Sequence, residues 1–378
     1  MKVLIYGHGL TDKRLSVTGY AQWGLSRVRA FQSAISSSDE LYVADSSYYP
    51  QHVEFDIGVF IVSPYTIMRG NVIEREIISN LRSRCKVQLL EILWETTSIP
   101  VEWGQVLESF DGFIVGSEFC RSLISNIDKP TFLVPYAIGE IPSAPSIEER
   151  VSSNTFRVFY IGQNTVRKGI YDTLYGFFHA LGDCDDAELI IKTDNASPHL
   201  GQPDVSSLSM LIANSCCYEK PKSKVHVATG FVGREVIDEV FRTSTILLLP
   251  SRGEGFGIPY IEAILWGIPS IYVPWSSSVE TASYPCNFPV EFVMDAAYGM
   301  RKHGYDARSQ QYAVPLVGSI IDKLTEAYML WKTQRYAYFS RCLQARKDAI
   351  RRYSVKSATP YAKEVLTFSY DRRESCAK

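Results

Sequence analysis

Short apolar runs alternate with segments of helical periodicity throughout the first 134 residues. Apolar side chains recur at three- and four-residue steps over residues 18–35 and 72–81, which predicts helices there. The apolar runs, which predict strands, cover residues 3–6, 41–44, 57–62, 87–93, 112–115 and 131–134. Uniformly apolar strands separated by helices are typical of a parallel sheet that is covered on both faces.

The same alternation starts again at residue 156. Strands are predicted over residues 156–161, 189–191, 225–227, 245–249 and 268–273, and helices over residues 168–181, 233–243 and 257–266. The tail has helical periodicity over residues 316–332 and 335–353. A last helix is expected to start with Thr359 as its cap and Pro360 in its first position.

The segment between the two halves has little pattern. Residues 139–154 include two prolines and four serines, as linkers often do. We therefore expect a first domain over residues 1–140, a linker over 141–154, a second domain over 155–340 and a helical tail over 341–378. The fold class is α/β, with two Rossmann-like domains, and such a pair normally leaves a cleft between the carboxyl ends of its strands.

Composition and charge exclude several classes of protein. Hydrophobic residues make up 46% of the chain, so large cores can be buried, and 39 basic side chains balance 41 acidic ones. That balance argues against a general nucleic-acid-binding surface. No apolar run is long enough to span a membrane, and the opening run is too short for a signal peptide. We expect a cytoplasmic protein without an integral membrane segment, for which peripheral membrane contact stays open.

The most informative segment is PSRGEGFGIPYIEA, residues 250–263. A predicted strand runs into a glycine-rich turn, and a helix is expected to begin near Gly257. The backbone N–H groups of Phe256, Gly257 and Ile258 can face an anion at such a helix start. The natural partners of the two carboxylates, Glu254 and Glu262, are hydroxyl groups. A nucleotide sugar offers hydroxyls on both sides of its diphosphate.

This segment resembles family 4 of the retaining glycosyltransferases, which have the two-domain GT-B fold. Glu254 and Glu262 form an E-x7-E pair, and Gly267-Ile268-Pro269 follows it at the expected place. Weaker similarities are Arg167-Lys168-Gly169 after the strand 156–161, Gly230-Phe231-Val232-Gly233, Thr18-Gly19-Tyr20, and Trp94-Glu95 with Pro100 and Trp103. The resemblance implies that the first domain lies on the acceptor side and the second binds the nucleotide sugar. It also implies that the two domains face each other across a cleft and that the last helices cross back onto the first domain.

The resemblance assigns roles to the residues of the motif. Glu262 would bind the ribose of the donor, Glu254 the hydroxyls of the transferred sugar, and Lys168 the distal phosphate. The family usually has an arginine shortly after Gly162, where this chain has Gln163. Either Arg167 substitutes for that arginine or the phosphate clamp is weaker.

Two further candidates lie in the first domain. Gly9 belongs to the loop after the first predicted strand, which in the GT-B fold approaches the donor phosphates or the acceptor. Glu95 follows the strand 87–93, whereas Glu91 lies inside that strand. Many family members place a histidine near Glu95, and this chain has none there. Glu95 is therefore a candidate to face the acceptor, with an ordinary loop glutamate as the alternative.

The predicted function is transfer of a hexose from a UDP- or GDP-linked sugar to a hydroxyl of a glycan, lipid or protein. The resemblance implies retention of anomeric configuration. We expect no cofactor and no metal, because Lys168 and Arg167 can neutralise the diphosphate. The alternatives are a nucleotide-sugar epimerase or sugar phosphorylase on the same fold, an NAD-dependent oxidoreductase, and a non-catalytic GT-B binding protein.

Overall fold

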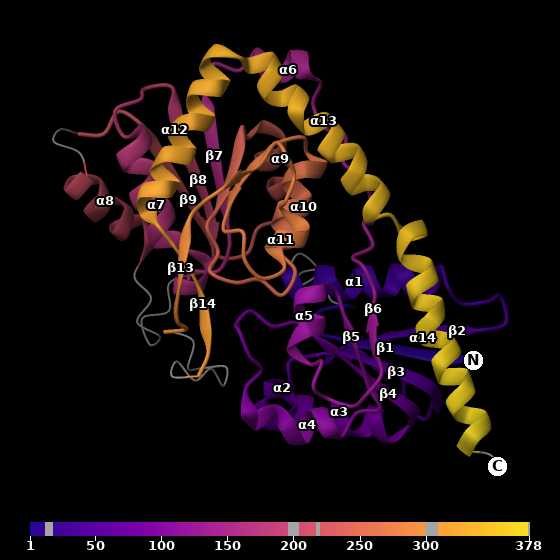
Figure 1. Cartoon of the computed structure of the whole chain (residues 1–378). Helices are drawn as coiled ribbons and strands as arrows, with labels where there is room; N and C mark the ends of the chain where they lie inside the picture. The colour runs from indigo at the N-terminus through magenta and orange to yellow at the C-terminus, as the bar shows by residue number, and fades with distance from the viewer. Residues whose placement is uncertain (12–17, 196–203, 217–219, 299–308, 377–378) are drawn as a thin grey trace. The chain divides into compact units, whose positions relative to one another are not determined.

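The computed structural model describes residues 1–11, 18–195, 204–216, 220–298 and 309–376. The chain divides into two compact units, one formed by Met1–Ile141 with the described residues from Ile350 onward, the other by the described residues of Pro142–Met300 and Ala307–Ala349. Each unit is built around one six-stranded sheet (Figure 1). Every ladder of these two sheets is parallel.

The first sheet has the strand order β2-β1-β3-β4-β5-β6. Its strands are β1 (Lys2–Gly7), β2 (Glu40–Ala44), β3 (Phe55–Ile61), β4 (Cys85–Ile92), β5 (Gly112–Val115) and β6 (Thr131–Leu133). The side chains of β1, β3 and β5 are almost all buried, because helices cover both faces of a parallel sheet. The order departs from the sequence order between β1 and β3, where the chain changes direction across the sheet.

Helices of the first unit are α1 (Gly19–Gln32), α2 (Pro64–Arg69), α3 (Val72–Ser83), α4 (Gly104–Glu108), α5 (Glu118–Leu123) and α14 (Val355–Cys376), with the 3₁₀ turn η1 (Val101–Trp103). The last helix, α14, packs against α1 and the sheet (Figure 1). Arg27 of α1 donates two hydrogen bonds of 2.8 Å to Glu91 of β4. Glu91 lies inside β4, as predicted, and both side chains of this pair are fully buried.

The second sheet has the strand order β12-β11-β10-β7-β8-β9. Its strands are β7 (Phe156–Ile161), β8 (Ala187–Thr193), β9 (Lys224–Thr229), β10 (Ile246–Leu249), β11 (Ser270–Tyr272) and β12 (Phe288–Pro289). An antiparallel pair, β13 (Phe292–Ala296) and β14 (Gln311–Pro315), stands apart from this sheet. The two central strands, β7 and β10, are neighbours in the sheet, although β8 and β9 lie between them in the sequence.

Helices of the second unit are α6 (Ile147–Val151), α7 (Ile170–Leu181), α8 (Val205–Cys216), α9 (Arg234–Thr243), α10 (Ile258–Leu265), α11 (Ser278–Thr281), α12 (Val317–Thr333) and most of α13 (Arg335–Arg352), with the 3₁₀ turn η2 (Val166–Lys168). Helices α7 and α12 pack closely. Gly176 allows this approach, since a Cβ there would come within 2.5 Å of Ile320. Phe156, Phe177, Leu247 and Trp331 are fully buried in the core of this unit.

The predicted α/β fold class is confirmed, since each unit contains a parallel sheet with flanking helices. The start predicted for the last helix is wrong. Ser354 accepts the Ser357 N–H at 3.1 Å, so α14 begins at Val355 and Pro360 lies inside it. The Thr359 hydroxyl donates to the Val355 carbonyl at 2.8 Å instead of capping a helix.

The segment expected to be an unpatterned linker contains a helix. Ser146 accepts the Glu149 N–H and the Glu149 side chain accepts the Ser146 N–H, which is a complete capping box for α6. Arg150 of that helix is buried and donates to the Ser244 carbonyl at 2.9 Å. The helix is therefore anchored in the second unit.

Candidate active site

The candidate site lies where β7 and β10 run side by side. Parallel pairing places Val158 beside Ile246 and Phe159 beside Leu247. The chain crosses the sheet in one direction after β7 and in the other after β10, so the loops at their carboxyl ends separate. Ligands of open parallel sheets bind at such a switch point. The loop after β7 carries Arg167 and Lys168, and the loop after β10 carries Glu254.

Three close contacts shape the loop after β10. Gly257, the residue before α10, has a φ of +87°, which a side chain would disfavour, and a Cβ there would come within 2.8 Å of the Tyr260 ring. The Tyr260 hydroxyl donates to the Leu249 carbonyl at 2.8 Å, which ties the helix back to the end of β10. Thr281 of α11 donates to the Phe256 carbonyl at 2.9 Å. The turn between strand and helix is therefore fixed from both sides.

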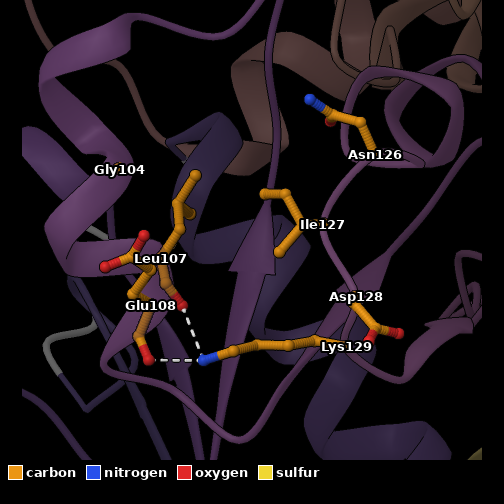
Figure 2. A pocket seen from close by; sticks show the side chains of 7 residues that line it. All are labelled: Gly104, Leu107, Glu108, Asn126, Ile127, Asp128 and Lys129. Atoms are coloured by element: carbon orange, nitrogen blue, oxygen red, sulfur yellow. Dashed lines mark hydrogen bonds between the residues drawn. The ribbon is translucent and has the colours of Figure 1, made fainter.

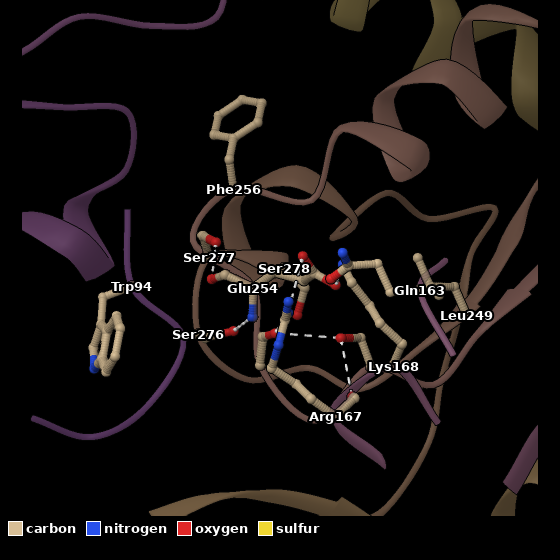
Figure 3. A network of polar contacts seen from close by, with 12 residues as sticks. Trp94, Gln163, Arg167, Lys168, Leu249, Glu254, Phe256, Ser276, Ser277 and Ser278 are labelled. Atoms are coloured by element: carbon tan, nitrogen blue, oxygen red, sulfur yellow. Dashed lines mark hydrogen bonds and ion pairs between the residues drawn. The ribbon is translucent and has the colours of Figure 1, made fainter. Parts of the chain in front are cut away.

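Glu254 is the centre of a buried charge cluster in this loop (Figure 3). Its Oε1 lies 2.6 Å from Lys168 Nζ and its Oε2 lies 3.7 Å from Arg167 Nη1. Arg167 also donates to the Gly253 carbonyl at 2.7 Å. Burial acts to raise the pKa of Glu254, but the charges of Lys168 and Arg167 outweigh burial and hold this pKa below its usual value. The cluster thus contains one ionised carboxylate and two cations.

A glycine sets the distance between the two loops. Gly169 has a φ of +70°, and a Cβ there would come within 2.4 Å of the Pro250 carbonyl oxygen. The Arg252 N–H donates to the Arg167 carbonyl at 2.7 Å. Lys168 was expected at the start of the α-helix, and this expectation is wrong. It ends the 3₁₀ turn η2, and α7 begins at Ile170 because Gly169 in the left-handed conformation separates the turn from the helix.

Serines of the loop after β11 hold the backbone of Glu254. The Glu254 N–H donates to Ser276 Oγ at 2.9 Å, and the Ser277 hydroxyl donates to the Glu254 carbonyl. Ser276 has a φ of +58°, a left-handed conformation that is uncommon for a residue with a Cβ. The loop therefore keeps Ser276 in a strained conformation next to Glu254. A run of serines after a strand does not reveal this contact in the sequence.

Glu262 lies two turns further along, in α10, and has a different partner. Arg234, the first residue of α9, contacts Glu262 Oε1 through Nη1 and lies 2.7 Å from Asp238 Oδ1 through Nη2. The Glu262 side chain is only 15% exposed. Burial raises its pKa, and the Arg234 guanidinium opposes that rise. Arg234 was not among the predicted site residues.

The remaining predicted residues of the second unit lie in the same two loops or, for Ile258, at the start of α10. Phe256 and Gly257 are buried, Ile258 is half-buried, and Gln163 is exposed after β7. Figure 3 shows the side chains of Gln163, Arg167 and Lys168 together with Glu254. The missing arginine at position 163 thus leaves Arg167 and Lys168 as the cations nearest to Glu254 in the described part of this loop.

Gly9 and Glu95 belong to the first unit. Gly9 is buried in the turn after β1 and has a φ of +69°. The adjoining Thr11 N–H donates to Asp45 Oδ2 at 2.8 Å, at the end of β2. Glu95 is half-buried and lies three residues beyond the end of β4, between the buried Trp94 and Thr96. Because Gly9 follows β1, it lies at the carboxyl end of its sheet, beside the point between β1 and β3 where the strand order changes.

A cavity of 340 Å³ in the first unit lies elsewhere (Figure 2). It is lined by Gly104, Leu107, Glu108, Asn126, Ile127, Asp128 and Lys129. The Lys129 ammonium donates to the Leu107 carbonyl at 3.3 Å and also to the Glu108 and Phe110 carbonyls. Lys129 thus satisfies the carbonyls at the end of α4, a structural role. The cavity precedes β5 and β6, at the amino ends of these strands, where sites of parallel sheets are not expected.

Among the described residues, no group of three or more His, Cys, Asp or Glu side chains is arranged to hold a metal ion. None of the helices that the structure describes combines the length and the apolar character needed to cross a bilayer.

Comparison with known proteins agrees with the geometry of the second unit. Residues 155–283 match the family model described as glycosyl transferases group 1. This range includes η2, β10, α10 and the loop after β11, and therefore every residue of the Glu254 cluster. The comparison with curated proteins found no match.

Solved structures of similar fold cover nearly the whole chain. Sucrose-phosphate synthase from Thermosynechococcus elongatus aligns with a TM-score of 0.64 at 11% identity and covers 100% of both chains. Anabaena HepE, solved with UDP and glucose, aligns with a TM-score of 0.62 at 12% identity over 97% of this chain and 99% of its own. A glycosyltransferase from Rickettsia africae aligns with a TM-score of 0.61 at 12% identity over 98% of both chains. The chain has the GT-B fold, and its residues 155–283 match the group 1 glycosyltransferase domain; together these findings support a GT-B glycosyltransferase.

Proposed function

We propose that this protein is a retaining glycosyltransferase of the family 4 type, which transfers a hexose from a nucleoside diphosphate sugar to an acceptor hydroxyl. The observation that carries the proposal is the cluster of Lys168, Arg167 and Glu254 at the switch point between β7 and β10. A sugar diphosphate needs cations beside its phosphates and a carboxylate beside its sugar hydroxyls. The cluster supplies both from two adjacent loops.

The reaction requires stabilisation of a departing diphosphate. The bond between the anomeric carbon and the phosphate oxygen breaks, and a bond from that carbon to the acceptor oxygen forms. The acceptor proton passes to the departing phosphate oxygen, which lies on the same face of the sugar in a retaining front-face displacement. Lys168 and Arg167 would neutralise the negative charge that grows on the diphosphate. No resident metal is required for this step, and we propose that the activity is metal-independent.

Glu254 would accept hydrogen bonds from the transferred sugar. Its carboxylate lies 2.6 Å from Lys168 Nζ, and the charges of Lys168 and Arg167 keep this buried carboxylate ionised. An ammonium has three N–H donors, so Lys168 can contact Glu254 and a donor phosphate at the same time. Glu262 would bind the ribose hydroxyls through the carboxylate that Arg234 contacts. Arg167 would take the place of the arginine that is absent at Gln163.

The donor is proposed to be UDP- or GDP-linked. HepE was solved with UDP and glucose, and a pneumococcal O-GlcNAc transferase of similar fold, GtfA, with UDP and GlcNAc. These neighbours favour UDP as the first donor to test. We propose a cytoplasmic enzyme whose acceptor is a glycan, lipid or protein, and we retain Glu95 and Gly9 as candidates for contact with the reactants.

An NAD-dependent oxidoreductase is disfavoured by Asp45 of the first unit. In dinucleotide-binding folds an acidic residue near the end of the second strand binds the ribose. Asp45 instead accepts the N–H groups of Thr11, Ser47 and Tyr48 at 2.8, 2.8 and 3.1 Å and the Ser47 hydroxyl at 2.7 Å. Its oxygens are therefore engaged in fixing the loops of the first unit.

A binding and turnover panel tests the proposal. Thermal shifts with UDP-, GDP- and ADP-sugars, NAD and inorganic phosphate would identify the ligand class. Release of nucleoside diphosphate and formation of a glycosylated product would then be followed with simple sugar acceptors in the presence of EDTA, and nuclear magnetic resonance would give the anomeric configuration. We expect a shift with one nucleotide sugar and metal-independent transfer with retention. Turnover to an epimerised sugar, or dependence on phosphate without nucleotide, would establish the epimerase or phosphorylase alternative.

A further inference from the structure

The first residue of α9 is a cation, although the helix N-terminus disfavours one. The helix dipole places partial positive charge at Gly233 and Arg234, where an acidic residue is normally favourable. Arg234 is nevertheless held there by two carboxylates, Glu262 of α10 and Asp238 one turn further along α9. Its contact with Glu262 joins residues 28 positions apart in the sequence. Neither helix propensity nor the helix dipole explains an arginine at this position. The contact with Glu262 explains it.

The contact uses one oxygen of the Glu262 carboxylate. Arg234 Nη1 donates to Oε1, and no second group of the described residues donates to this carboxylate. Only 15% of the Glu262 side chain is exposed to solvent. A buried carboxylate is stable only with a charge partner or with hydrogen bonds. Lys168 and Arg167, the other cations of the site, are engaged with Glu254.

We infer that Arg234 is a positioning residue for donor binding, which fixes the orientation of the Glu262 carboxylate and keeps it ionised so that it can accept both ribose hydroxyls. This inference rests on the proposed function, in which Glu262 binds the ribose. Arg234 itself acts through Glu262 and not through the nucleotide. An ionised carboxylate can accept two hydroxyl protons side by side, whereas a protonated one must use one oxygen as a donor.

Loss of Arg234 would make ribose recognition depend on pH. Among the residues that the structure describes, the charged groups that face Glu262 are Arg234 and Asp238, both of α9. Burial and Asp238 each raise the pKa of Glu262, and Arg234 is the group that opposes them. Without the guanidinium this pKa rises further, so a larger fraction of Glu262 is protonated at any given pH. The defect should therefore be largest at low pH and smaller at high pH.

The test compares UDP with 2′-deoxy-UDP, and GDP with 2′-deoxy-GDP, by calorimetric titration of the full chain at pH 6.5 and 8.5. The ratio of the two Kd values reports ribose recognition and is insensitive to effects on the phosphates. We expect the wild type to prefer the ribonucleotide by about tenfold or more, as for a hydrogen bond to a charged group. Glu262→Gln should bring the ratio close to one at both pH values.

Three arginine variants then separate the roles. Arg234→Gln should lose most of the preference at pH 6.5 and regain part of it at pH 8.5, while Arg234→Lys should retain it. Arg242→Gln is the matched control, because Arg242 lies on the same helix and pairs with Glu239 at 2.6 Å, on the exposed surface. It should keep the wild-type ratio.

Two results would overturn the inference about Arg234. One is a wild-type ratio in Arg234→Gln at both pH values. The other is an equal loss at both pH values that lysine does not rescue, which indicates direct contact with the nucleotide or general disruption. If Glu262→Gln keeps the wild-type preference, or no nucleotide binds the wild type, the proposed role of Glu262 fails, and the inference fails with it.

Discussion

Glu254 is the residue whose charge is most directly linked to the proposed chemistry. Replacing it with glutamine keeps its shape and removes the charge that Lys168 contacts at 2.6 Å. If the lost stabilisation of the transition state is about 2.7 kcal/mol, kcat falls about 100-fold, with a smaller change in donor KM. Steady-state kinetics with the donor that the wild type uses would measure both parameters.

The matched control for this variant is Glu239→Gln, which removes an exposed ion pair of the same unit. That variant should keep wild-type kinetics, because exposed pairs contribute little. A folded Glu254→Gln protein with unchanged kcat would show that Glu254 does not act on the reacting sugar. The assignment of the E-x7-E motif would then lose its main support.

Ser276 combines backbone strain with a hydrogen bond to Glu254. Ser276→Ala loses the bond from the Glu254 N–H and keeps the left-handed conformation, at a cost of about 1–3 kcal/mol. Ser276→Gly loses the same bond but relieves strain of about 1 kcal/mol. Scanning calorimetry should therefore give the glycine variant a higher Tm than the alanine variant, by about 2–4 °C. Equal Tm values would mean that the strain at Ser276 is negligible.

The E-x7-E motif could be found from the sequence because its glycines, carboxylates and flanking strand all point to one turn. The residues that support it could not be found in the same way. Ser276 matters through its backbone conformation and its contact with a loop 22 residues away, and neither is visible in a run of serines. Arg234 at a helix start did carry a signal, since a cation there requires a counter-charge.

At the scale of elements, Arg252 connects the loop after β10 with α7 and β14. Its Nη2 donates to Asp172 of α7 at 2.9 Å and its Nη1 to the Tyr312 hydroxyl of β14 at 3.3 Å. Its carbonyl accepts the Ala313 N–H at 2.9 Å. Arg252→Met leaves the buried Asp172 carboxylate without its cation, and we expect the free energy of unfolding to fall by about 3–5 kcal/mol. Urea denaturation measures this change.

A double-mutant cycle checks the cause of this loss. Asp172→Asn in the Arg252→Met background should recover part of the stability, because no charge is then left unpaired. Additive losses would show that Arg252 and Asp172 are not coupled. The stability of Arg252→Lys should lie between that of the wild type and that of Arg252→Met. Lysine keeps the positive charge but lacks the rigid guanidinium fork that contacts both Asp172 and Tyr312.

Strands were easier to predict than helix ends. Buried parallel strands read as continuous apolar runs, and residues 156–161 and 112–115 coincide with β7 and β5. Helix starts depend on caps and turns, and three differ from the prediction. Ser354 caps α14 ahead of Thr359, the Ser146–Glu149 capping box starts a helix in the expected linker, and Gly169 delays the start of α7 to Ile170. The pair β13 and β14 was not predicted, because the continuous apolar run in each strand is only three residues long, FVM and YAV.

At the scale of the whole molecule, the repeated alternation of strands and helices predicts two parallel sheets but not their strand orders. The first sheet has the strand order β2-β1-β3-β4-β5-β6, and the second places β7 next to β10. Both orders arise from packing of the crossover helices, which leaves little trace in the apolar pattern. The order of the second sheet is what brings Lys168, 86 residues away in sequence, beside Glu254.

This topology predicts where the full chain responds to a nucleotide. Binding stabilises the segments that contact the ligand by about 2.7 kcal/mol at a concentration 100 times Kd, so hydrogen exchange that requires nucleotide release slows about 100-fold. With UDP or GDP, we expect slower exchange in the loop after β7, in residues 250–258 and in the loop after β11, which meet at Glu254. Strands β1, β3 and β5 of the first unit should exchange as in the free protein. Hydrogen-exchange mass spectrometry with and without nucleotide measures this pattern. Protection confined to the first unit would show that the nucleotide binds to the first unit and not beside Glu254.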